Sequence, residues 1–583
     1  MLTPLAFIAG FAAFLLLPRI HNQPVLVFSF VAATAALLVW YAVLWQRARA
    51  RRTPLRIGLS LRPQHYLQAL AHTSIFVYWG MYWPPIQEAA PLIAGQIVFA
   101  YAFDMLLSWT RKNEFVLGFG PFPIIYSTNL FLRFRDDWFY LQFLMVAIGF
   151  LAKELIQWQR DGRRGHIFNP SSFPLALFSL ILIVTRTSGI TWAQDIASLL
   201  ILPPHIYLFI FLVALPGQFL FSVTTMTLPA VLTTYAFSLL YLRLTGTYFF
   251  FDANVPIAVF LGMHLLFTDP STAPKTELGR VLFGVCYGLS VVALYAVLDA
   301  IGAPTYYDKL LPVPIMNLLV RQFDRIGRSA TLAWLSPAQL GTALVPRARS
   351  AVYVTMWILA FGVMTRAQGL GNYHPGQAIP FWENACDGGR VKACDNLAAM
   401  HQRYCDDGSA WSCNELGVLG VTGKTKVENP AALFRHACES SLVAGCENVS
   451  AVTHNRTPDK RGDPRLPDYL LVLQGGRGPL PDLPPAEIFQ RACDEGFVAG
   501  CGSVGDSYFR AKEAQKARAI WEGTCTRGHA MSCSNLGVMS HLGDGVAKDD
   551  AMAATYMKRA CALGLTNACQ LVEELTGARP QLQ

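Results

Sequence analysis

The sequence lacks the short motifs that mark several large enzyme classes. It contains no G-x-x-x-x-G-K-[ST], no G-x-G-x-x-G that follows a strand, and no H-E-x-x-H. Nucleotide hydrolysis and zinc-peptidase chemistry are therefore not expected, and the motifs leave open whether the chain is an enzyme. No nucleic-acid-binding motif accompanies the net charge of +9, most of which comes from basic loops between apolar segments. We expect no nucleic-acid partner.

Apolar runs fill the first two thirds of the chain. The whole chain is 53% hydrophobic with a mean hydropathy of +0.34, although its last third is polar. Residues 1 to about 368 are therefore expected to form a polytopic helical membrane domain. Gly and Pro interrupt the fifth run, which predicts a broken or re-entrant helix there. The thirteen candidate spans lie near 4–17, 25–45, 66–83, 91–109, 115–134, 138–156, 167–187, 196–222, 226–243, 253–268, 281–299, 303–320 and 350–365.

Arginine and lysine residues cluster in six of the loops between these runs. With thirteen spans all six clusters fall on one side of the membrane, and basic residues are retained in short cytoplasmic loops. This bias predicts a cytoplasmic N-terminus and an extracytoplasmic position for everything after about Thr365. Arg133 and Arg135 fall on the other side and count against the scheme.

Twelve of the thirteen cysteines form pairs whose members are eight residues apart. On one helix such residues are about 12 Å apart, whereas a disulfide tolerates a Cα separation of ~4.4–6.8 Å. If the pairs are bridged, the helix must end between them, with a second helix beginning near the second cysteine, and the chain lies in an oxidising compartment. Zinc is the alternative, but zinc-binding pairs usually sit about two to four residues apart, so no metal site is predicted. The pairs are Cys386/Cys394, Cys405/Cys413, Cys438/Cys446, Cys493/Cys501, Cys525/Cys533 and Cys561/Cys569, which leaves Cys286 as a reduced, buried thiol.

The cysteine pairs belong to an internal repeat. Second helices open alike, as in "SCNELGVL" and "SCSNLGVM", and the preceding helices end as "FRHAC" and "FQRAC". The stretch "SNLGVMSHLGDGVAKDDAMAATYMKRACALG" resembles a Sel1-like repeat in its cysteine-paired form, over about 380–575. The resemblance implies an α-solenoid of disulfide-braced helix-turn-helix repeats that binds periplasmic or membrane proteins. Some relatives have been assigned β-lactam hydrolysis, which ranks last here because the sequence has no S-x-x-K.

Two stretches of the apolar region carry a second resemblance. Asn169 and Pro170 open a span in "GHIFNPSSFPLALF", and Asp269, Pro270 and Thr272 lie in "MHLLFTDPSTAPKTELGRVLFG". Taken alone, these are helix-boundary signals. Together they resemble the membrane subunits of the Rnf and Na⁺-pumping quinone reductase complexes, the RnfD/NqrB family, over roughly 60–320. The resemblance implies a redox-active or ion-coupled electron-transfer module in a bacterial inner membrane.

That family carries a flavin mononucleotide (FMN) on the threonine of an S-G-A-T motif, on the side of the membrane away from the cytoplasm. Here Ser188, Gly189 and Thr191 supply a comparable stretch, and the expected topology places it outside. Ile190 replaces the alanine, and Arg186 stands near the place of the usual acidic residue. The resemblance implies FMN at Thr191, and a plain periplasmic loop is the alternative.

Histidines within the apolar region are further redox candidates. His65 and His72 are seven residues apart and share a helix face, while His205 and His264 lie in later spans. Pairs of intramembrane histidines can ligate haem b, which ranks below FMN as a cofactor. The alternative for each is a buried histidine that is hydrogen-bonded to another helix. His264 stands beside "TDPSTAP" and is the strongest of the four candidates.

The chain is therefore expected to be all-α, with a polytopic transmembrane domain followed by an α-solenoid. We expect an N-terminal hairpin and basic loop over 1–60, a multi-span RnfD/NqrB-like domain over 61–368, and a periplasmic repeat domain over 369–583. The leading function is an electron-transfer module that carries an interaction array. The alternative is a non-redox membrane scaffold whose repeats bind a periplasmic partner.

Overall fold

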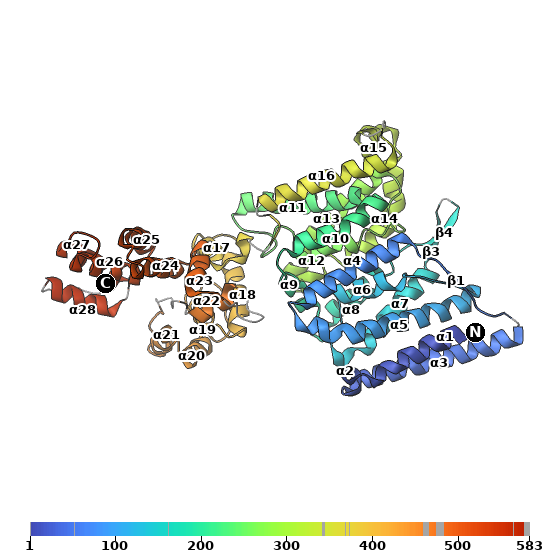
Figure 1. The fold of residues 1–583 in the computed structure, drawn as a ribbon, viewed down its shortest axis with the longest axis horizontal. Coiled ribbons are helices and arrows are strands. Elements are labelled where there is room, and N and C mark those ends of the chain that lie inside the picture. Colours follow the sequence, from blue (N-terminus) through green and yellow to red (C-terminus); the bar gives the residue numbers. More distant parts are fainter. Residues whose placement is uncertain are drawn as a thin grey trace. The chain divides into compact units, whose positions relative to one another are not determined.

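The chain divides into two compact units in its computed structural model. The membrane unit comprises Met1–Leu240 with Tyr248–His374, and the repeat unit comprises Tyr241–Thr247 with Pro375–Gln583. Helices dominate both units, as Figure 1 shows. The structure describes residues 2–51, 53–160, 162–340, 344–367, 369–371, 374–458, 464, 466–473, 483–563 and 565–576.

The membrane unit begins with a helical hairpin. Helix α1 (Leu2–Ala13) is followed by the one-turn α2 (Pro18–His21) and the long α3 (Pro24–Arg51). Both α1 and α3 pack against α5, the second helix of the next series (Figure 1).

Two series of five helices follow, and each has a short, buried helix in third place. All nine residues of α12 are buried, as are most of α6, so neither short helix has a lipid-facing side. The first series is α4 (Pro63–Gly80), α5 (Pro84–Lys112), α6 (Pro121–Phe131), α7 (Tyr140–Leu155) and α8 (Ser172–Thr185). The short α9 (Ala193–Leu199) precedes the second series, which is α10 (Ile206–Phe221), α11 (Thr224–Thr245), α12 (Ile257–Leu265), α13 (Glu277–Ala300) and α14 (Pro312–Gly327). After these come α15 (Pro337–Leu340) and α16 (Pro346–Arg366).

Five described helices are long and apolar enough to cross a membrane. They are Pro24–Arg51, Pro84–Lys112, Thr224–Thr245, Glu277–Ala300 and Arg347–Arg366, with shorter apolar helices at Leu2–Leu16, Ser172–Thr185 and Ile206–Phe221. Each of the thirteen apolar runs contains one of the helices described above. In the interrupted fifth run, where the sequence predicts a broken or re-entrant helix, the first residues lie in a short strand and one short helix begins at Pro121.

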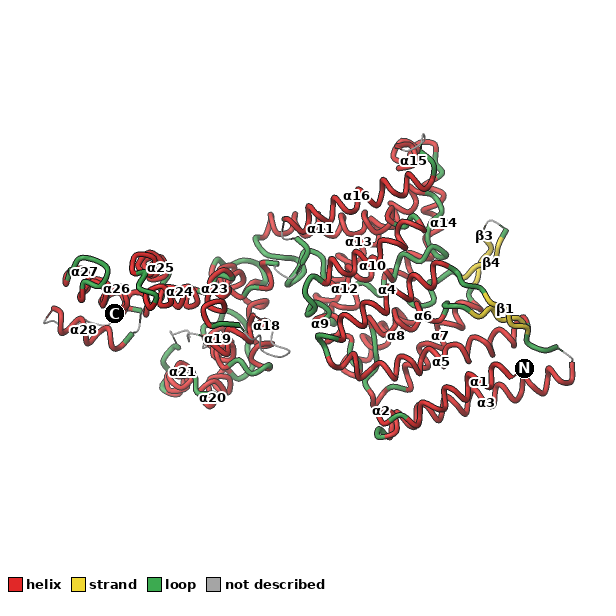
Figure 2. The backbone as a smooth tube through the Cα atoms, viewed as in Figure 1, coloured by secondary structure: helices red, strands yellow, loops and turns green. Residues whose placement is uncertain are grey.

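Four short strands were not predicted. Strand β1 (Arg56–Leu59) pairs in parallel with β2 (Glu114–Leu117), and β3 (Gln157–Arg160) pairs antiparallel with β4 (Arg163–His166). Figure 2 shows both pairs at the same end of the helix bundle. The all-α fold class is otherwise confirmed, because all four strands are four residues long and connect helices.

Two glycines bring α13 into backbone contact with α11. A Cβ on Gly284 would lie 2.2 Å from the carbonyl oxygen of Met226, and one on Gly288 would lie 2.7 Å from that of Ala230. Any larger side chain would force the helices apart. Small residues serve this purpose at the helix interfaces of membrane proteins.

The thirteenth cysteine, Cys286, lies in α13 as a free thiol. It is half-buried rather than fully buried, which corrects the prediction in part. One face of α13 packs against neighbouring helices and the other does not. Cys286 lies between these two faces, so its side chain stays partly exposed.

The repeat unit is a series of helix-turn-helix pairs, and a disulfide closes each of six turns. Each first cysteine lies near a helix end, and the turn that follows contains a left-handed residue in the first five pairs, such as Gly408 (φ 102°) or Ser441 (φ 67°). The helices are α17 (Ile379–Asp387), α18 (Ala393–Asp406), α19 (Ala410–Val421), α20 (Pro430–Glu439), α21 (Val443–Thr453), α22 (Leu466–Leu473), α23 (Pro485–Asp494), α24 (Val498–Arg510), α25 (Ala514–Thr526), α26 (Ala530–Leu542), α27 (Asp550–Ala562) and α28 (Thr566–Thr576).

All six cysteine pairs are bridged within the pair, as the spacing predicts. Each Cα separation is short enough for a disulfide and far below the distance between residues eight apart on one helix. The bridges, with their Cα separations, are Cys386–Cys394 (4.6 Å), Cys405–Cys413 (4.7 Å), Cys438–Cys446 (4.6 Å), Cys493–Cys501 (4.4 Å), Cys525–Cys533 (4.8 Å) and Cys561–Cys569 (4.8 Å).

Five of the six second cysteines lie at the fourth residue of their helices, and Cys394 lies at the second residue of α18. Cys413 lies at the end of the first turn of α19, which begins at Ala410, and Cys569 lies at the same place in α28, which begins at Thr566. These helices begin before the cysteine because hydrogen bonds already stabilise the first turn. In α19 the Ser409 hydroxyl accepts a hydrogen bond from the backbone N–H of Ser412 at 3.2 Å. Each bridge therefore joins the end of one helix to the first full turn of the next.

Helix α18 explains the one short step in the repeat spacing. It holds Cys394 near its start and Cys405 near its end, so it is bridged to α17 at one end and to α19 at the other. The solenoid of disulfide-braced helix-turn-helix repeats that the Sel1-like resemblance implies is confirmed.

The six bridges differ in their access to solvent. Cys525 and Cys533 are buried, at 3% and 0% exposure, whereas Cys446 is exposed and Cys438 is half-buried. Because thiol attack needs access to sulfur, limiting reductant is expected to open Cys438–Cys446 well before Cys525–Cys533. Timed alkylation with peptide mapping measures the order, and equal rates for the two bridges would contradict it.

Candidate functional site

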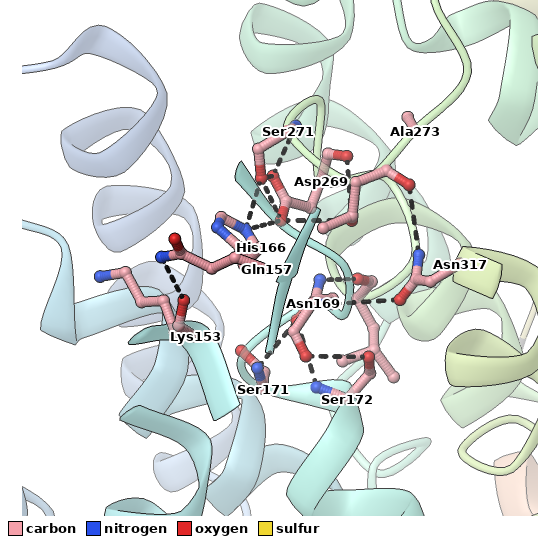
Figure 3. A network of polar contacts seen from close by, with 12 residues as sticks. Lys153, Gln157, His166, Asn169, Ser171, Ser172, Asp269, Ser271, Ala273 and Asn317 are labelled. Carbon is pink, nitrogen blue, oxygen red and sulfur yellow. Dashed lines mark hydrogen bonds and ion pairs between the residues drawn. The ribbon is translucent and has the colours of Figure 1, made fainter. Parts of the chain in front are cut away.

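The two stretches that carry the second resemblance meet in one polar network. Asn169 lies just before α8, and its side-chain oxygen accepts hydrogen bonds from the backbone N–H groups of Ser171 (2.8 Å) and Ser172 (3.1 Å). Its side-chain nitrogen donates to the carbonyl of Leu266, at 2.8 Å, just after α12. Asn317 of α14 accepts from the Asn169 backbone at 3.0 Å and donates to the carbonyl of Thr272 at 3.2 Å, as Figure 3 shows. One asparagine therefore caps α8 and fixes the chain after α12.

Asp269 organises the turn that follows. Its carboxylate accepts from the Ser271 backbone at 2.9 Å and from the Ser271 hydroxyl at 2.7 Å, and the Thr272 hydroxyl lies 3.3 Å away. His166 of β4 contacts the same Ser271 hydroxyl through Nε2, at 2.9 Å (Figure 3). Burial raises the pKa of Asp269, but hydrogen bonds with His166 and Ser271 outweigh this and lower it below the usual value. The carboxylate form is thus favoured in this turn.

Asp324 of α14 holds the rest of the loop. Its Oδ1 accepts from the backbone N–H groups of Lys275 (2.8 Å) and Thr276 (3.0 Å), and its Oδ2 accepts from the guanidinium of Arg160. Arg160 also donates to the carbonyl of Ala273 at 2.9 Å. Loop 269–276 is therefore fastened to β3, β4 and α14.

The predicted site residues in this network already have partners inside the protein. The side chains of Asn169, Asp269 and Thr272 all bond to neighbouring protein groups, and the carbonyl of Pro170 faces Gly149 of α7. As arranged, these residues brace helix ends.

Ser188, Gly189 and Thr191 lie in a separate loop. Residues 188–190 form a single helical turn, and Thr191 pairs in an isolated bridge with Phe134. The Thr191 side chain is 2% exposed, and its hydroxyl donates to the carbonyl of Ser188 at 2.9 Å. Ser188 accepts a hydrogen bond from the Tyr307 hydroxyl at 3.0 Å.

This loop does not fit a phosphoester at Thr191 in the arrangement described. Attachment of FMN needs an accessible hydroxyl, and that of Thr191 is buried and hydrogen-bonded. Arg133 and Arg135 flank the Trp192 ring instead, at 5.6 and 4.4 Å from its centre. Since alternate residues of an extended strand point to opposite faces, these arginines lie on the face away from Thr191.

The four histidines contact different groups of the protein. His72 contacts the carbonyl of Gln68 at 2.7 Å and the hydroxyl of Ser127 at 3.3 Å. His65 lies beside Gly120, and His205 precedes α10 in a left-handed conformation. His264 is buried, and its Nδ1 lies 2.7 Å from the carbonyl of Phe260. Among the residues that the structure describes, no cluster of three or more His, Cys, Asp or Glu could hold a metal ion.

The bridged cysteines have a structural role in the repeat unit. Cys413 is fully buried in α19, directly before Asn414, so its bridge fixes the start of the helix that carries the polar groups described next. Cys569 is half-buried, and its Sγ lies 3.6 Å from the carbonyl oxygen of Leu565. Both sulfurs are held in disulfides, so neither cysteine can act as a thiolate nucleophile or a metal ligand while its bridge is intact.

The repeat unit has a buried polar chain that the motifs did not predict. Asn448 of α21 donates to the Asn414 side chain at 2.9 Å, and Asn414 donates to Glu415 at 3.2 Å. Glu415 and the buried His401 line a pocket of about 170 Å³ with Glu383. The signal in the sequence is the polar residue one or two places after the second cysteine, as in "CNEL" and "CENV".

The same position recurs later in the repeats. Asn535 of α26 donates to the carboxylate of Asp506 at 2.8 Å, and the indole N–H of Trp521 donates to it at 3.1 Å. Burial raises the pKa of Asp506, and these two hydrogen bonds oppose the rise only in part. Polar contacts of this kind fix the packing between successive repeats.

These features define a class of protein: a polytopic helical membrane unit joined to a disulfide-braced repeat array. Cytochrome c oxidase assembly factor 7 from Xenopus tropicalis is 30% identical over 182 residues, which is 29% of this chain and 71% of that protein. Cytochrome c oxidase assembly factor 7 from Homo sapiens is 28% identical over 182 residues, 29% of this chain and 72% of that protein. Over the matched part, this chain belongs to the cytochrome c oxidase assembly factor 7 family.

Two further comparisons do not extend this family assignment. No protein-family model matches the chain. Among solved structures, a protective antigen of uropathogenic Escherichia coli with an SLR fold is 14% identical, with a TM-score of 0.17 over 71% of this chain and 81% of the antigen. At that score the two chains do not superpose as wholes.

Proposed function

We propose that the chain is a membrane-anchored assembly factor whose repeat unit binds a protein partner while a respiratory oxidase is assembled. The observation that supports this most is the set of six bridged helix-turn-helix pairs. Solenoids present extended surfaces for protein binding, and bridges that fix each turn reduce the entropy lost on binding. The names of the related proteins supply the kind of partner, subunits of cytochrome c oxidase.

We place the contact with such a partner at the pocket beside Glu415. Lys424 lines this pocket and forms an ion pair with Asp387. Reversal of its charge in Lys424→Glu would place two carboxylates together at the pocket, which disfavours an acidic partner and changes the local field for any other. The Lys424 side chain is 35% exposed, so the substituted carboxylate can still reach water.

Capture of oxidase subunits from native membranes tests the proposal. We expect detergent-purified wild-type chain to retain oxidase subunits and Lys424→Glu to retain at least ~10-fold less, a loss typical of a charge change at an interface. Lys548→Glu is the matched control, because Lys548 is an exposed lysine near an aspartate in a later repeat. Equal capture by all three chains would exclude this pocket, and no oxidase subunit on the wild type would exclude the function.

We also propose that the chain lies in a bacterial inner membrane with a cytoplasmic N-terminus and periplasmic repeats. The positions of the basic loops and the six disulfides support this, since disulfides persist in oxidising compartments. A reporter that is active only in the periplasm is expected to work when fused after Gly369 and to be silent when fused at Gly162. Activity at Gly162 would overturn the topology.

An electron-transfer module is the second proposal. The convergence of Asn169 with loop 269–276 favours it, because the two stretches that resemble the RnfD/NqrB family form one network. Covalent FMN at Thr191 stays a prediction that requires its loop to open. In-gel fluorescence of the denatured chain, present in wild type and lost in Thr191→Ala, would establish it. A purified chain with neither flavin nor haem absorbance would leave only the scaffold function.

A further inference from the structure

A pocket in the membrane unit contains two buried polar side chains that have no partner. Gln218 of α10 is 1% exposed, and neither atom of its amide forms a hydrogen bond. His264 of α12 is 3% exposed, and its Nε2 is likewise unpartnered. Buried polar groups are almost always hydrogen-bonded, so two exceptions that line one pocket indicate that a ligand supplies the missing bonds.

The pocket lies between α4, α10 and the end of α12. The space in it that water-sized groups can occupy measures about 50 Å³. The described residues that line it include no Asp, Glu, Lys or Arg, and most are apolar. They are Gln64, Leu67, Gln68, Ala71, Val213, Ala214, Gly217, Gln218, Phe221, Val223, His264, Leu265, Thr268 and Pro270.

Whether Nε2 of His264 is a donor or an acceptor in the pocket follows from the hydrogen bond made by Nδ1, the other nitrogen of the ring. Nδ1 of His264 lies 2.7 Å from the carbonyl oxygen of Phe260. A carbonyl only accepts, so Nδ1 must carry the hydrogen, and in the neutral ring Nε2 is then a bare acceptor. Gln218 adds one acceptor, Oε1, and one donor, Nε2. Two other polar side chains at the wall are occupied, because Gln68 donates to the carbonyl of Leu265 and Thr268 donates to that of His264. Gln64, which is half-buried, also lines the wall.

Charge and size restrict the ligand. An ion would enter without a counter-charge, which makes its desolvation costly. A pocket volume of about 50 Å³ holds roughly three to five water-sized groups, since one water needs about 10–15 Å³ on this measure. The ligand is therefore neutral, has few heavy atoms, and carries more than one N–H or O–H donor together with an acceptor.

We propose that this pocket binds a small uncharged amide of the carboxamide or urea class. Its N–H groups donate to Nε2 of His264 and Oε1 of Gln218, and its carbonyl accepts from Nε2 of Gln218. The proposal does not depend on the assembly function, because it concerns a different unit of the chain and a different kind of ligand.

Gly217 provides a means to close the pocket without damage to the fold. It lines the pocket, and a Cβ placed on it would meet no atom within 4 Å. Gly217→Val therefore adds bulk at the pocket wall without a clash with the rest of the protein. Gly362 of α16 is the matched control, since it also has open space at its Cβ but lies outside the pocket.

Saturation-transfer NMR on the full chain in detergent, with acetamide and urea as probes, tests the proposal. A ligand of about four heavy atoms binds weakly, so we expect dissociation constants of about a millimolar or weaker. We expect transfer to both probes but not to N,N-dimethylacetamide, which lacks N–H donors. The signal should fall at least ~10-fold in Gly217→Val and remain in Gly362→Val.

A substitution at Gln218 separates a binding role from a structural one. Gln218→Leu keeps a similar volume and removes two unpartnered atoms, so it is expected to raise the melting temperature while it abolishes transfer to acetamide. Lower stability in Gln218→Leu would mean that the amide has a structural role. Transfer no stronger for acetamide and urea than for dimethylacetamide, or unchanged in Gly217→Val, would show that the pocket holds only water and would overturn the proposal.

Discussion

Reduction of all six disulfides is expected to unfold the repeat unit. Each bridge closes a loop of about nine residues, for which the chain-entropy model gives about 2–3 kcal/mol. Six such contributions give about 12–18 kcal/mol, which is comparable with or larger than the 5–15 kcal/mol by which a domain is usually stable. The bridges also hold each turn between helices, so without them a helix pair has only its apolar contacts with neighbouring repeats.

Far-UV circular dichroism of the full chain in detergent, with and without a membrane-permeant phosphine, measures this effect. The signal lost should correspond to the repeat helices, and proteolysis should then cleave residues after 374 while the membrane unit stays intact. A repeat unit that keeps its helices and its protease resistance when every cysteine is alkylated would show that apolar packing alone is sufficient.

Replacement of Asp324 by leucine is expected to destabilise the membrane unit by about 3–5 kcal/mol, the range for breaking a buried ion pair. The substitution leaves the Arg160 guanidinium without its carboxylate and two backbone N–H groups, those of Lys275 and Thr276, without an acceptor. The side chains of Asp324 and Arg160 are only 6% and 12% exposed, so water cannot replace these bonds fully.

Thermal unfolding in detergent, followed by tryptophan fluorescence, measures the loss. Asp324→Asn should cost less, because its amide oxygen can still accept from the backbone of loop 269–276. Glu154→Gln serves as the control, since the Lys112–Glu154 pair is more exposed, at 53% and 19%, and surface pairs contribute about 0–1 kcal/mol. Equal shifts for Asp324→Leu and Glu154→Gln would mean that the loop is held by other contacts.

The repeat architecture could be predicted because cysteine spacing is a geometric constraint. Two cysteines eight apart cannot be bridged on one helix, so a bridge between Cys493 and Cys501 requires a turn between two helices. The 4.4 Å between their Cα atoms confirms this prediction. Helix α18 could not be foreseen as a shared helix, because that depends on which pairs stack and not on the spacing within a pair.

The network around Asn169 could be predicted only in part. Asn and Asp before proline mark helix boundaries, and Asn169 and Asp269 lie at such boundaries. The residues that hold the two stretches in place gave no signal, since Asn317 and Asp324 lie in another helix that carries neither motif. Polar residues buried in helix contacts, such as Gln218, are also invisible to hydropathy, which averages each of them with its apolar neighbours.

Short strands were missed for a related reason. The segments "RIGL" and "EFVL" are four residues long, and they pair over a gap of more than fifty residues. A strand of that length has no alternation long enough to distinguish it from the end of a helix. Its partner is determined by how α5 returns to the same end of the bundle.

The amount of assembled cytochrome c oxidase in the native membrane tests the central claim most directly. It should be measured, by native gel and by haem absorbance, in cells whose only copy of the chain ends after residue 371 and therefore keeps the membrane unit without the repeats. We predict that assembled oxidase falls at least ~10-fold, as expected when a partner-binding surface is removed whole, and returns when the full chain is restored. Oxidase at the wild-type level in the truncated strain, with the truncated chain present in the membrane, would contradict the account.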